Sequence, residues 1–387
     1  MESKNQSSKW LSTAVVFFGF FVMGFVDIVG ISTNYIKKDF ALSSSVANTI
    51  PLMVFVWFLF FSIPVGILMS KIGRKQTVLL SLMLTAVAIA IPFFIYTFLS
   101  VVISFSLLGI SNAILQVALF PLIASMFSEN RTAGMITMGT FFKAIASFVG
   151  PILVGFTSAY YNNWKITFIF LSIASLLSVI LLYFTKIDEI NFKNSPTNFR
   201  SVLSQLKKEY ILACFIIILL IVGFDVGINT SIPELLVTRV GLSLDRAALG
   251  ISVYFAARTA GAFLGAFILL KIEPYTYLVY TLVGSIVAFL WIFFVSNLWM
   301  LLILIFIIGF CCANVFSIVF SLALRREPSH VNDISALMIM GISGGALILP
   351  LQGIISDHVN FTSSLVILLA TLVLIFLLLF KIRVKPI

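Results

Sequence analysis

Four ionisable side chains lie deep within stretches of the chain that are otherwise almost wholly apolar. Asp27 stands in FVDIVGIST and Asp225 in FDVGINT, while Lys143 and Arg258 lie well inside two other apolar stretches. An ionised side chain at the centre of a lipid bilayer costs between about 2.5 and more than 10 kcal/mol, so such residues face a partner or a water-filled cavity. A carboxylate that takes up a proton loses its attraction for a cation, and this chemistry can couple protonation to conformation.

We therefore predict that Asp27 and Asp225 couple protons and that Lys143 and Arg258 are their charge partners. At 1.5 Å per residue, the two bases lie roughly 18–20 Å from the faces at which their helices enter, close to mid-membrane. Pairing Asp27 with Lys143 and Asp225 with Arg258 is a hypothesis from depth alone. The alternative is that each pair only neutralises itself and holds two helices together.

Neutral polar residues and aromatic rings accompany the acids. Asn34 lies seven residues beyond Asp27, and Asn229 lies four beyond Asp225, which places each on the helical face of its acid. Amides offer several donors and acceptors to a polyhydroxylated ligand, and an aromatic ring offers an apolar face to a sugar. Each amide can equally be a tie between helices. The predicted substrate-binding residues are Asn34, Trp57, Asn112, Gln116, Asn229, Tyr254, Asn314 and Gln352.

The composition explains why a buried acid is unusual here. Of 387 residues, 61% are hydrophobic and only 10% are charged, and the mean hydropathy is +1.18. A soluble domain is roughly 45–50% apolar and about 25% charged, so this chain has too little polar surface to cover a water-exposed globule. The three cysteines lie within apolar runs, which argues against a disulfide framework or a metal cluster. We expect an integral membrane protein without a cleaved signal peptide.

Apolar runs of membrane-spanning length recur from end to end. Most of the 24 lysines and arginines fall on one side if both termini are cytoplasmic, which explains the net charge of +10 without an acidic or nucleic-acid partner. The twelve predicted spans are 10–36, 46–70, 76–96, 98–126, 131–160, 164–184, 207–238, 245–270, 274–295, 297–324, 332–357 and 361–382.

One long polar segment divides the chain into two sets of six spans. We predict an N-terminal bundle at 1–185, a cytoplasmic linker at 186–206 and a C-terminal bundle at 207–387. The halves align at an offset near 200, which pairs Asp27 with Asp225 and Pro151 with Pro350. A six-helix unit repeated in one orientation is typical of transporters in which two halves rock about a site near the midplane. The expected fold class is an all-α membrane protein of two pseudo-symmetric bundles.

The turn after the second span carries a recognisable motif. It reads GILMSKIGRKQTV, in which Gly66 permits close helix approach and Gly73, Arg74 and Lys75 suit a tight basic turn at an anionic membrane face. The segment resembles the cytoplasmic signature of the major facilitator superfamily, and these four residues are the predicted cytoplasmic gate motif. Ser70 stands where the signature has an acid, so a charge lock of the usual kind is not expected.

Within that superfamily, the stretches GFVDIVGISTNYIKKDFALS, GISNAILQVALFPLI and MGTFFKAIASFVGPI resemble the fucose permease branch of sugar:proton symporters. In that branch, an acid in the first helix and another in the fourth line the sugar cavity and take part in proton coupling. The first acid matches Asp27. The second falls on Gln116, which can bind a hydroxyl but cannot titrate.

Three functions remain open. The first is proton-coupled symport of a sugar, a sugar acid or another small polar solute by alternating access. The second is proton-coupled export of an amphipathic compound, favoured by FVGPILVG, which resembles the Gly-Pro motif of drug:proton antiporters. The third is a sensor or scaffold that kept the fold without transporting.

No nucleotide-binding loop, metal-ligand spacing or nucleophilic triad stands out in the sequence, so we expect neither an enzyme nor a bound cofactor or metal. The expected partners are a small-molecule substrate, protons and the lipid bilayer, with no nucleic acid. The expected state is a monomer in the bacterial cytoplasmic (inner) membrane, with both termini cytoplasmic.

Overall fold

The computed structural model describes residues 2–42, 46, 49–187, 198–242 and 249–383 of the chain. Within these ranges all regular secondary structure is helical. Twelve segments are long and apolar enough to cross a membrane, and their ends agree with the predicted spans to within five residues. The prediction of an all-helical protein with twelve membrane-spanning helices is confirmed.

Local sequence decides where several of these helices begin. Helices satisfy their own backbone hydrogen bonds and can therefore lie in lipid, but each terminus needs a cap. Thr97, Asn297 and Asn360 each accept a hydrogen bond from the backbone N–H three residues on, and so begin the helices that follow them. At the basic turn, Gly73 has a φ of 88°, a backbone conformation that favours glycine.

The chain forms two compact units that differ from the two halves of the sequence. The first unit comprises the described residues of 1–132, 139–203 and 327–340, and the second those of 133–138, 204–326 and 341–387. A short piece of the fifth span thus belongs to the second unit, and the first part of the eleventh span belongs to the first. The boundaries predicted at 185 and 207 stay predictions.

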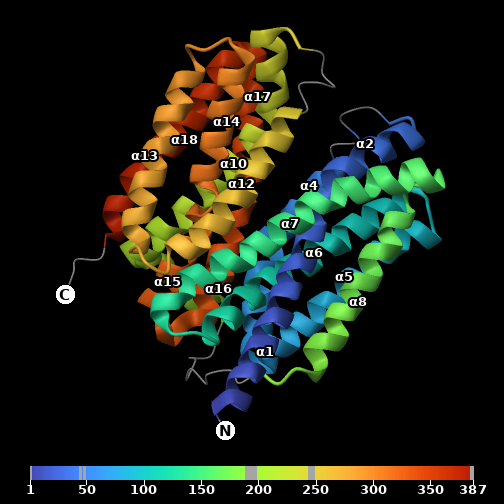
Figure 1. Ribbon diagram of the computed structural model, residues 1–387, viewed down its shortest axis with the longest axis vertical. Coiled ribbons are helices and arrows are strands. Elements are labelled where there is room, and N and C mark those ends of the chain that lie inside the picture. Colours follow the sequence, from blue (N-terminus) through green and yellow to red (C-terminus); the bar gives the residue numbers. More distant parts are fainter. Residues whose placement is uncertain (1, 43–45, 47–48, 188–197, 243–248, 384–387) are drawn as a thin grey trace. The chain divides into compact units, whose positions relative to one another are not determined.

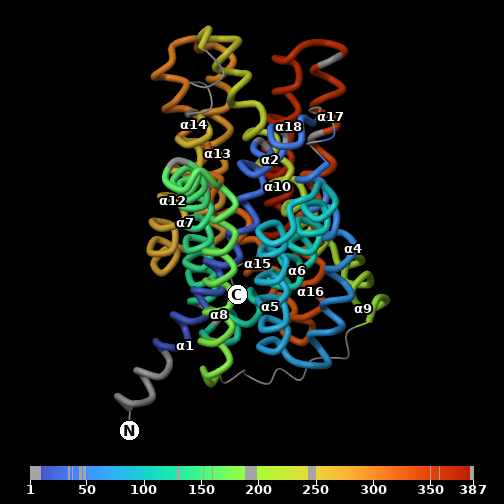
Figure 2. Tube along the Cα trace, turned by 90° about the vertical axis from the view of Figure 1, so that its right-hand side faces the viewer, coloured from blue at the N-terminus to red at the C-terminus, as the bar shows by residue number. Residues whose placement is uncertain are grey.

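In the first unit, α5, α6 and α8 lie side by side, and α4 lies against α6 (Figure 1). Helix α16 comes from far along the chain, yet it packs on α4 and α6 of this unit (Figure 2). The unit contains α1 (Glu2–Met23), η1 (Gly24–Ile28), α2 (Val29–Asp39), α4 (Thr49–Ile72), α5 (Arg74–Phe94), α6 (Phe98–Ser125), most of α7 (Glu129–Tyr161), α8 (Ile166–Phe184), α9 (Phe199–Ser204, whose last residue falls in the second unit), η3 (Pro328–His330) and α16 (Val331–Met340).

In the second unit, α13 lies between α14 and α18, while α10 contacts α12, α17 and α18 (Figure 1). The unit contains η2 (Gln205–Lys207), α10 (Glu209–Val240), α12 (Leu249–Ile268), α13 (Pro274–Ile292), α14 (Leu298–Cys312), α15 (Val315–Arg326), η4 (Gly341–Gly344), α17 (Gly345–His358) and α18 (Phe361–Ile382).

Three spans are interrupted within their apolar stretch. The first changes from α1 to the 3-10 turn η1 and back to α2, the tenth breaks between α14 and α15, and the eleventh passes through η4. A short stretch of 3-10 helix inside a longer helix often marks a hinge or a site of strain. Asp27 lies within η1, so the first deep acid stands in such an interruption.

Candidate functional site

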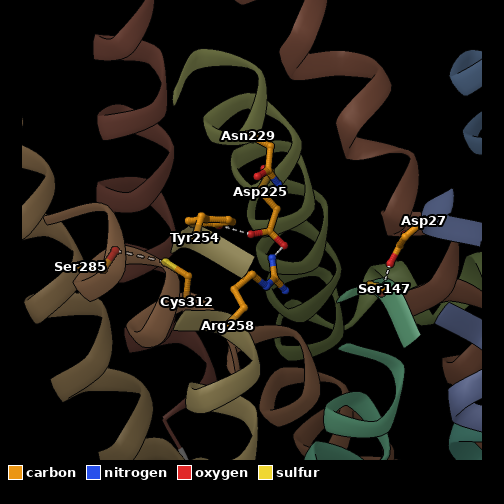
Figure 3. Close-up of polar contacts among 8 residues, drawn as sticks. All are labelled: Asp27, Ser147, Asp225, Asn229, Tyr254, Arg258, Ser285 and Cys312. Carbon is orange, nitrogen blue, oxygen red and sulfur yellow. Dashed lines mark hydrogen bonds and ion pairs between the residues drawn. The ribbon is translucent and has the colours of Figure 1, made fainter. Parts of the chain in front are cut away.

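Asp225 is the centre of a charged cluster in the second unit (Figure 3). The Arg258 guanidinium forms an ion pair with Asp225 Oδ2, and the Tyr254 hydroxyl donates a hydrogen bond to Oδ1. Tyr254 and Arg258 lie one turn apart on α12, so both reach the same carboxylate of α10. The exposed fractions of Arg258 and Asp225 are 24% and 19%, so the pair keeps some contact with solvent. The Arg258 guanidinium therefore neutralises the charge of Asp225.

Asn229 lies one turn from Asp225 and leaves one atom without a partner. Its Nδ2 donates to the backbone oxygen of Asp225 at 3.0 Å, whereas its Oδ1 is buried and accepts no hydrogen bond from any described residue. A buried acceptor without a donor costs about 1–3 kcal/mol. A ligand hydroxyl or a water molecule can satisfy that oxygen.

The environment of Asp27 in the first unit is different. Its Oδ2 accepts a hydrogen bond from Ser147 Oγ on α7 (Figure 3), and the same hydroxyl lies 3.0 Å from the backbone oxygen of Lys143. Within the described residues, the Lys143 ammonium comes within 4.0 Å of no carboxylate, Asp27 included. The pairing of Lys143 with Asp27 stays a prediction.

Two buried amides brace the turn that carries Asp27. Asn112 Nδ2 donates to the backbone oxygen of Met23 at 2.8 Å, where α1 gives way to η1, and Gln116 Nε2 donates to Asn112 Oδ1 at 2.6 Å. Both amide side chains are almost fully buried in α6. A carbonyl at the end of a helical segment needs such a donor. Asn112 and Gln116 therefore fix the position of the turn around Asp27.

Gly24 brings the same turn close to α7. A Cβ at this position would lie 2.7 Å from the Ala146 Cβ and would overlap the backbone oxygen of Lys143. Glycine is the residue that allows two helix backbones to approach so closely. The first helix therefore lies against α7 through Gly24 and is joined to it by the bond from Ser147 to Asp27.

The other predicted binding residues have varied surroundings. Asn314 is fully buried, and its Nδ2 donates to the Gly261 backbone oxygen and the Tyr277 hydroxyl, both at 2.8 Å. Gln352 Nε2 donates to Ser231 Oγ at 3.1 Å. Buried polar atoms without a hydrogen-bond partner among the described residues include Asn314 Oδ1, Gln352 Oε1 and Trp57 Nε1. Asn34 belongs to α2, but its side chain lies outside the part of the chain that the structure describes.

The residues of the predicted gate motif make contacts that join distant parts of the first unit. Lys75 Nζ donates to the backbone oxygens of Tyr183 at 3.1 Å and Thr185 at 2.7 Å, at the end of α8, while Gly66 is buried within α4. Arg74 Nε and Nη2 both lie 3.4 Å from Asn332 Oδ1 of α16. Ser70, which replaces the usual acid, donates a hydrogen bond to the backbone oxygen of Ile67 within its own helix.

Sequence reasoning missed Ser147 and Asn332. Ser147 follows Lys143 by four residues, so the helical period could have placed it beside Asp27, but a serine in an apolar helix is too common to single out. Asn332 is the first residue of the predicted eleventh span, and nothing in its neighbourhood indicates a contact with Arg74. Across the described residues, no group of three or more His, Cys, Asp or Glu side chains is arranged to hold a metal ion.

Twelve helices that are long and apolar enough to cross a membrane define a multi-pass membrane protein. The chain belongs to the major facilitator superfamily, whose family model matches residues 10–231 and again residues 211–387. The resemblance noted in the sequence is therefore confirmed.

Known proteins resemble the chain over nearly its whole length. A glucose/galactose transporter of Brucella abortus is 24% identical over 358 residues, which cover 88% of this chain and 86% of that protein. The Escherichia coli fucose:proton symporter FucP has a structure similar to this one at a TM-score of 0.85, with 16% identity over 98% of this chain and 100% of that chain. The proton:xylose symporter XylE matches at a TM-score of 0.76, with 15% identity over 97% of this chain and 96% of that chain. At these identities the solved structures establish the major facilitator fold.

Proposed function

We propose that this protein imports a sugar together with protons, by alternating access of a central site to the two sides of the membrane. The family, and relatives named for glucose, galactose, fucose and xylose transport, support a sugar as the substrate class. The partnerless oxygen of Asn229 beside the Asp225 cluster supports it too, because a sugar offers many hydroxyl donors. Tyr254, Trp57, Asn314 and Gln352 are the further binding candidates.

The observation that carries the proton coupling is the setting of Asp27. This acid lies in a 3-10 interruption and is held by a neutral hydroxyl. A hydrogen bond to an ionised carboxylate is roughly twice as strong as one between neutral groups. Protonation of Asp27 therefore weakens the bond from Ser147 and loosens the first helix from α7, without breaking an ion pair.

Asp225 is assigned a different role. Its protonation would remove the negative charge that pairs with the Arg258 guanidinium in a largely apolar setting, which is costly. We assign the Asp225 cluster to holding α10 against α12 and to presenting Asn229 to the substrate. Asp27 is then the proton-carrying acid, with Asn112 and Gln116 as the residues that position it.

The proposed setting is a monomer in the bacterial cytoplasmic membrane with both termini inside. The basic turn Gly73–Lys75 and most lysines and arginines then face the cytoplasm, as the positive-inside rule requires. The segment 186–206 is the cytoplasmic linker between the two bundles of the sequence repeat.

The test is uptake of labelled glucose, galactose and fucose into proteoliposomes under an imposed pH gradient, acid outside. We expect at least one sugar to accumulate above its external concentration and the accumulation to collapse when a protonophore removes the gradient. Accumulation that persists without the gradient would reject proton coupling. If no sugar or sugar acid moves while proton-driven efflux of amphipathic dyes occurs, the protein is an exporter and the proposal is wrong.

A further inference from the structure

Two adjacent arginines and a tyrosine form a positively charged patch in the second unit. Arg325 and Arg326 are the last residues of α15, and Tyr210 is the second residue of α10, which packs against α15. The Arg326 guanidinium lies over the Tyr210 ring, 5.4 Å from its centroid. The charges of Arg325 and Arg326 both act on the Tyr210 hydroxyl. These three residues are called the arginine patch.

Both guanidinium groups of the arginine patch have donors to spare. Among the residues that the structure describes, no carboxylate lies within 4.0 Å of either group, and neither group donates a hydrogen bond. Arg326 is exposed, whereas Arg325 is half-buried. Each guanidinium carries five N–H donors in a fixed fork. The patch can therefore hold an anion without first breaking an ion pair within the described chain.

The acids on the neighbouring elements are already engaged. Glu209 of α10 pairs with Lys381 of α18 at 3.6 Å. Glu273 accepts from the backbone N–H of Thr276 at 2.8 Å and from its hydroxyl at 2.9 Å, and so caps α13. Glu327 follows the two arginines in the sequence, but in the described chain it forms an ion pair with neither of them. The arginine patch therefore keeps its positive charge.

The patch lies where the chain enters and leaves the membrane. Tyr210 is the second residue of the membrane-spanning segment Glu209–Val240, and the two arginines end the segment Leu298–Arg326. Lipid headgroups lie at this depth, and those of anionic lipids attract basic residues. Exposed apolar side chains follow Tyr210 at Leu212 and precede α13 at Ile272. Acyl chains can lie against such side chains, so a lipid suits this position.

The chemistry of the three side chains suits a phosphate diester. An arginine guanidinium is a planar fork that binds two phosphate oxygens at once. A tyrosine hydroxyl can donate one further hydrogen bond, and its ring orients a guanidinium that lies over it. The positive-inside rule accounts for basic residues near helix ends, but it does not require a half-buried arginine beside a tyrosine.

We propose that Tyr210, Arg325 and Arg326 bind the phosphate of an anionic phospholipid, such as phosphatidylglycerol, in the leaflet where the tenth span ends. The bound headgroup joins the start of α10 to the end of α15 and so stabilises the second unit. The site is separate from the Asp225 cluster. It involves neither the substrate nor the proton of the proposed function.

The test counts lipids on the full-length protein and needs no transport. The protein is purified in detergent and titrated with phosphatidylglycerol or with phosphatidylcholine of the same acyl chains, and bound lipids are counted by native mass spectrometry. Both lipids carry a phosphate diester, but phosphatidylcholine has no net charge. We expect one phosphatidylglycerol to bind about tenfold more tightly than phosphatidylcholine, because each basic residue at a membrane surface favours an anionic lipid by about fivefold.

The variants locate the bound lipid. Arg325→Gln and Arg326→Gln should each weaken the binding of phosphatidylglycerol by about fivefold, and Tyr210→Phe by about twofold. Lys71→Gln is the matched control, since it removes one positive charge from an exposed helix end in the first unit and should bind as the parent does. Arg326 is exposed, so Arg326→Gln keeps the test available if Arg325→Gln does not fold.

Equal binding of the two lipids by the parent would overturn the proposal. It would also be overturned if Lys71→Gln weakened phosphatidylglycerol binding as much as Arg326→Gln does, because the lipid would then respond to the overall charge. Displacement of phosphatidylglycerol by millimolar inorganic phosphate would assign the arginine patch to a soluble anion instead. None of these results bears on the proposed function, which depends on the uptake of sugars under a pH gradient.

Discussion

Asp27 and Asp225 occupy matching positions in the sequence repeat, yet the protein holds them differently. The Asp225 carboxylate is paired with the Arg258 guanidinium and accepts a hydrogen bond from the Tyr254 hydroxyl. The Asp27 carboxylate accepts a hydrogen bond from the Ser147 hydroxyl and lies in a turn between two helical segments. A carboxylate that is paired with guanidinium resists protonation, because losing its charge abandons the ion pair. A carboxylate that is held by a hydroxyl loses much less interaction energy when it is protonated, because no ion pair is broken.

We infer from this difference that the two acids of the repeat have different roles. In the first unit the polar side chains of α6 hold the backbone around Asp27 and leave its carboxylate to Ser147. In the second unit the side chains of α12 hold the carboxylate itself. The first arrangement suits a group that changes its state and the second suits a fixed joint.

Removing the cation from the fixed joint should have the largest effect on stability. Arg258→Met leaves Asp225 partly buried and without its charge partner, and we expect it to lower the free energy of unfolding by about 2–3 kcal/mol, less than for a fully buried pair because both side chains retain solvent contact. Thermal unfolding in detergent measures this. Combining Arg258→Met with Asp225→Asn should recover most of the loss, and failure to recover it would argue against the pair as a joint.

The substitution Gly24→Ala tests the close approach of the first helix to α7. The added methyl group would overlap α7 and separate it from the first helix, and we expect a loss of about 1–3 kcal/mol. Gly30→Ala is the matched control, since a Cβ there meets no atom within 4 Å. Equal thermal stability of the two variants would mean that the first helix does not depend on contact at Gly24.

The brace around Asp27 is tested by Asn112→Leu. This change removes the donor to the Met23 backbone oxygen and deprives Gln116 of its acceptor, and we expect a loss of about 1–2 kcal/mol. The pH profile of sugar uptake should shift as well, because the turn that carries Asp27 is no longer fixed. If stability falls but the pH profile of uptake does not change, Asn112 only joins two helices and does not position Asp27 for proton coupling.

The smallest effects should come from removing one hydroxyl beside each acid. Ser147→Ala and Tyr254→Phe each delete a single hydrogen bond, and we expect each to lower stability by about 1 kcal/mol or less. Only Ser147→Ala should alter the pH dependence of uptake. An equal change of that dependence in Tyr254→Phe would remove the distinction between the two acids.

Much of the fold could be predicted from the sequence, because a helix that crosses lipid must be about 20 apolar residues long and the polar breaks between such runs are conspicuous. The superfamily could be predicted from the turn at Gly66–Lys75 together with the internal repeat. The interruptions could not, since the 3-10 turn at Gly24–Ile28 depends on amides that lie about ninety residues further along the chain.

The surroundings of the candidate site were less accessible to sequence reasoning. The depth of Arg258 in an apolar run indicates that it needs a charge partner, and in the structure it forms an ion pair with Asp225. Depth alone could not distinguish Lys143 from Ser147 as the neighbour of Asp27, because both lie on one face of α7. Nor could it assign α16 to the first unit, since that packing joins segments more than two hundred residues apart.

The most direct measurement compares Asp27→Asn with Asp225→Asn in proteoliposomes, using a sugar that the parent accumulates. For each variant, accumulation under a pH gradient is measured beside exchange of labelled for unlabelled sugar without a gradient. We predict that Asp27→Asn exchanges sugar at a rate near that of the parent but no longer accumulates it, whereas Asp225→Asn loses both activities together. Accumulation by Asp27→Asn, or exchange without accumulation by Asp225→Asn alone, would contradict the assignment of the proton to Asp27.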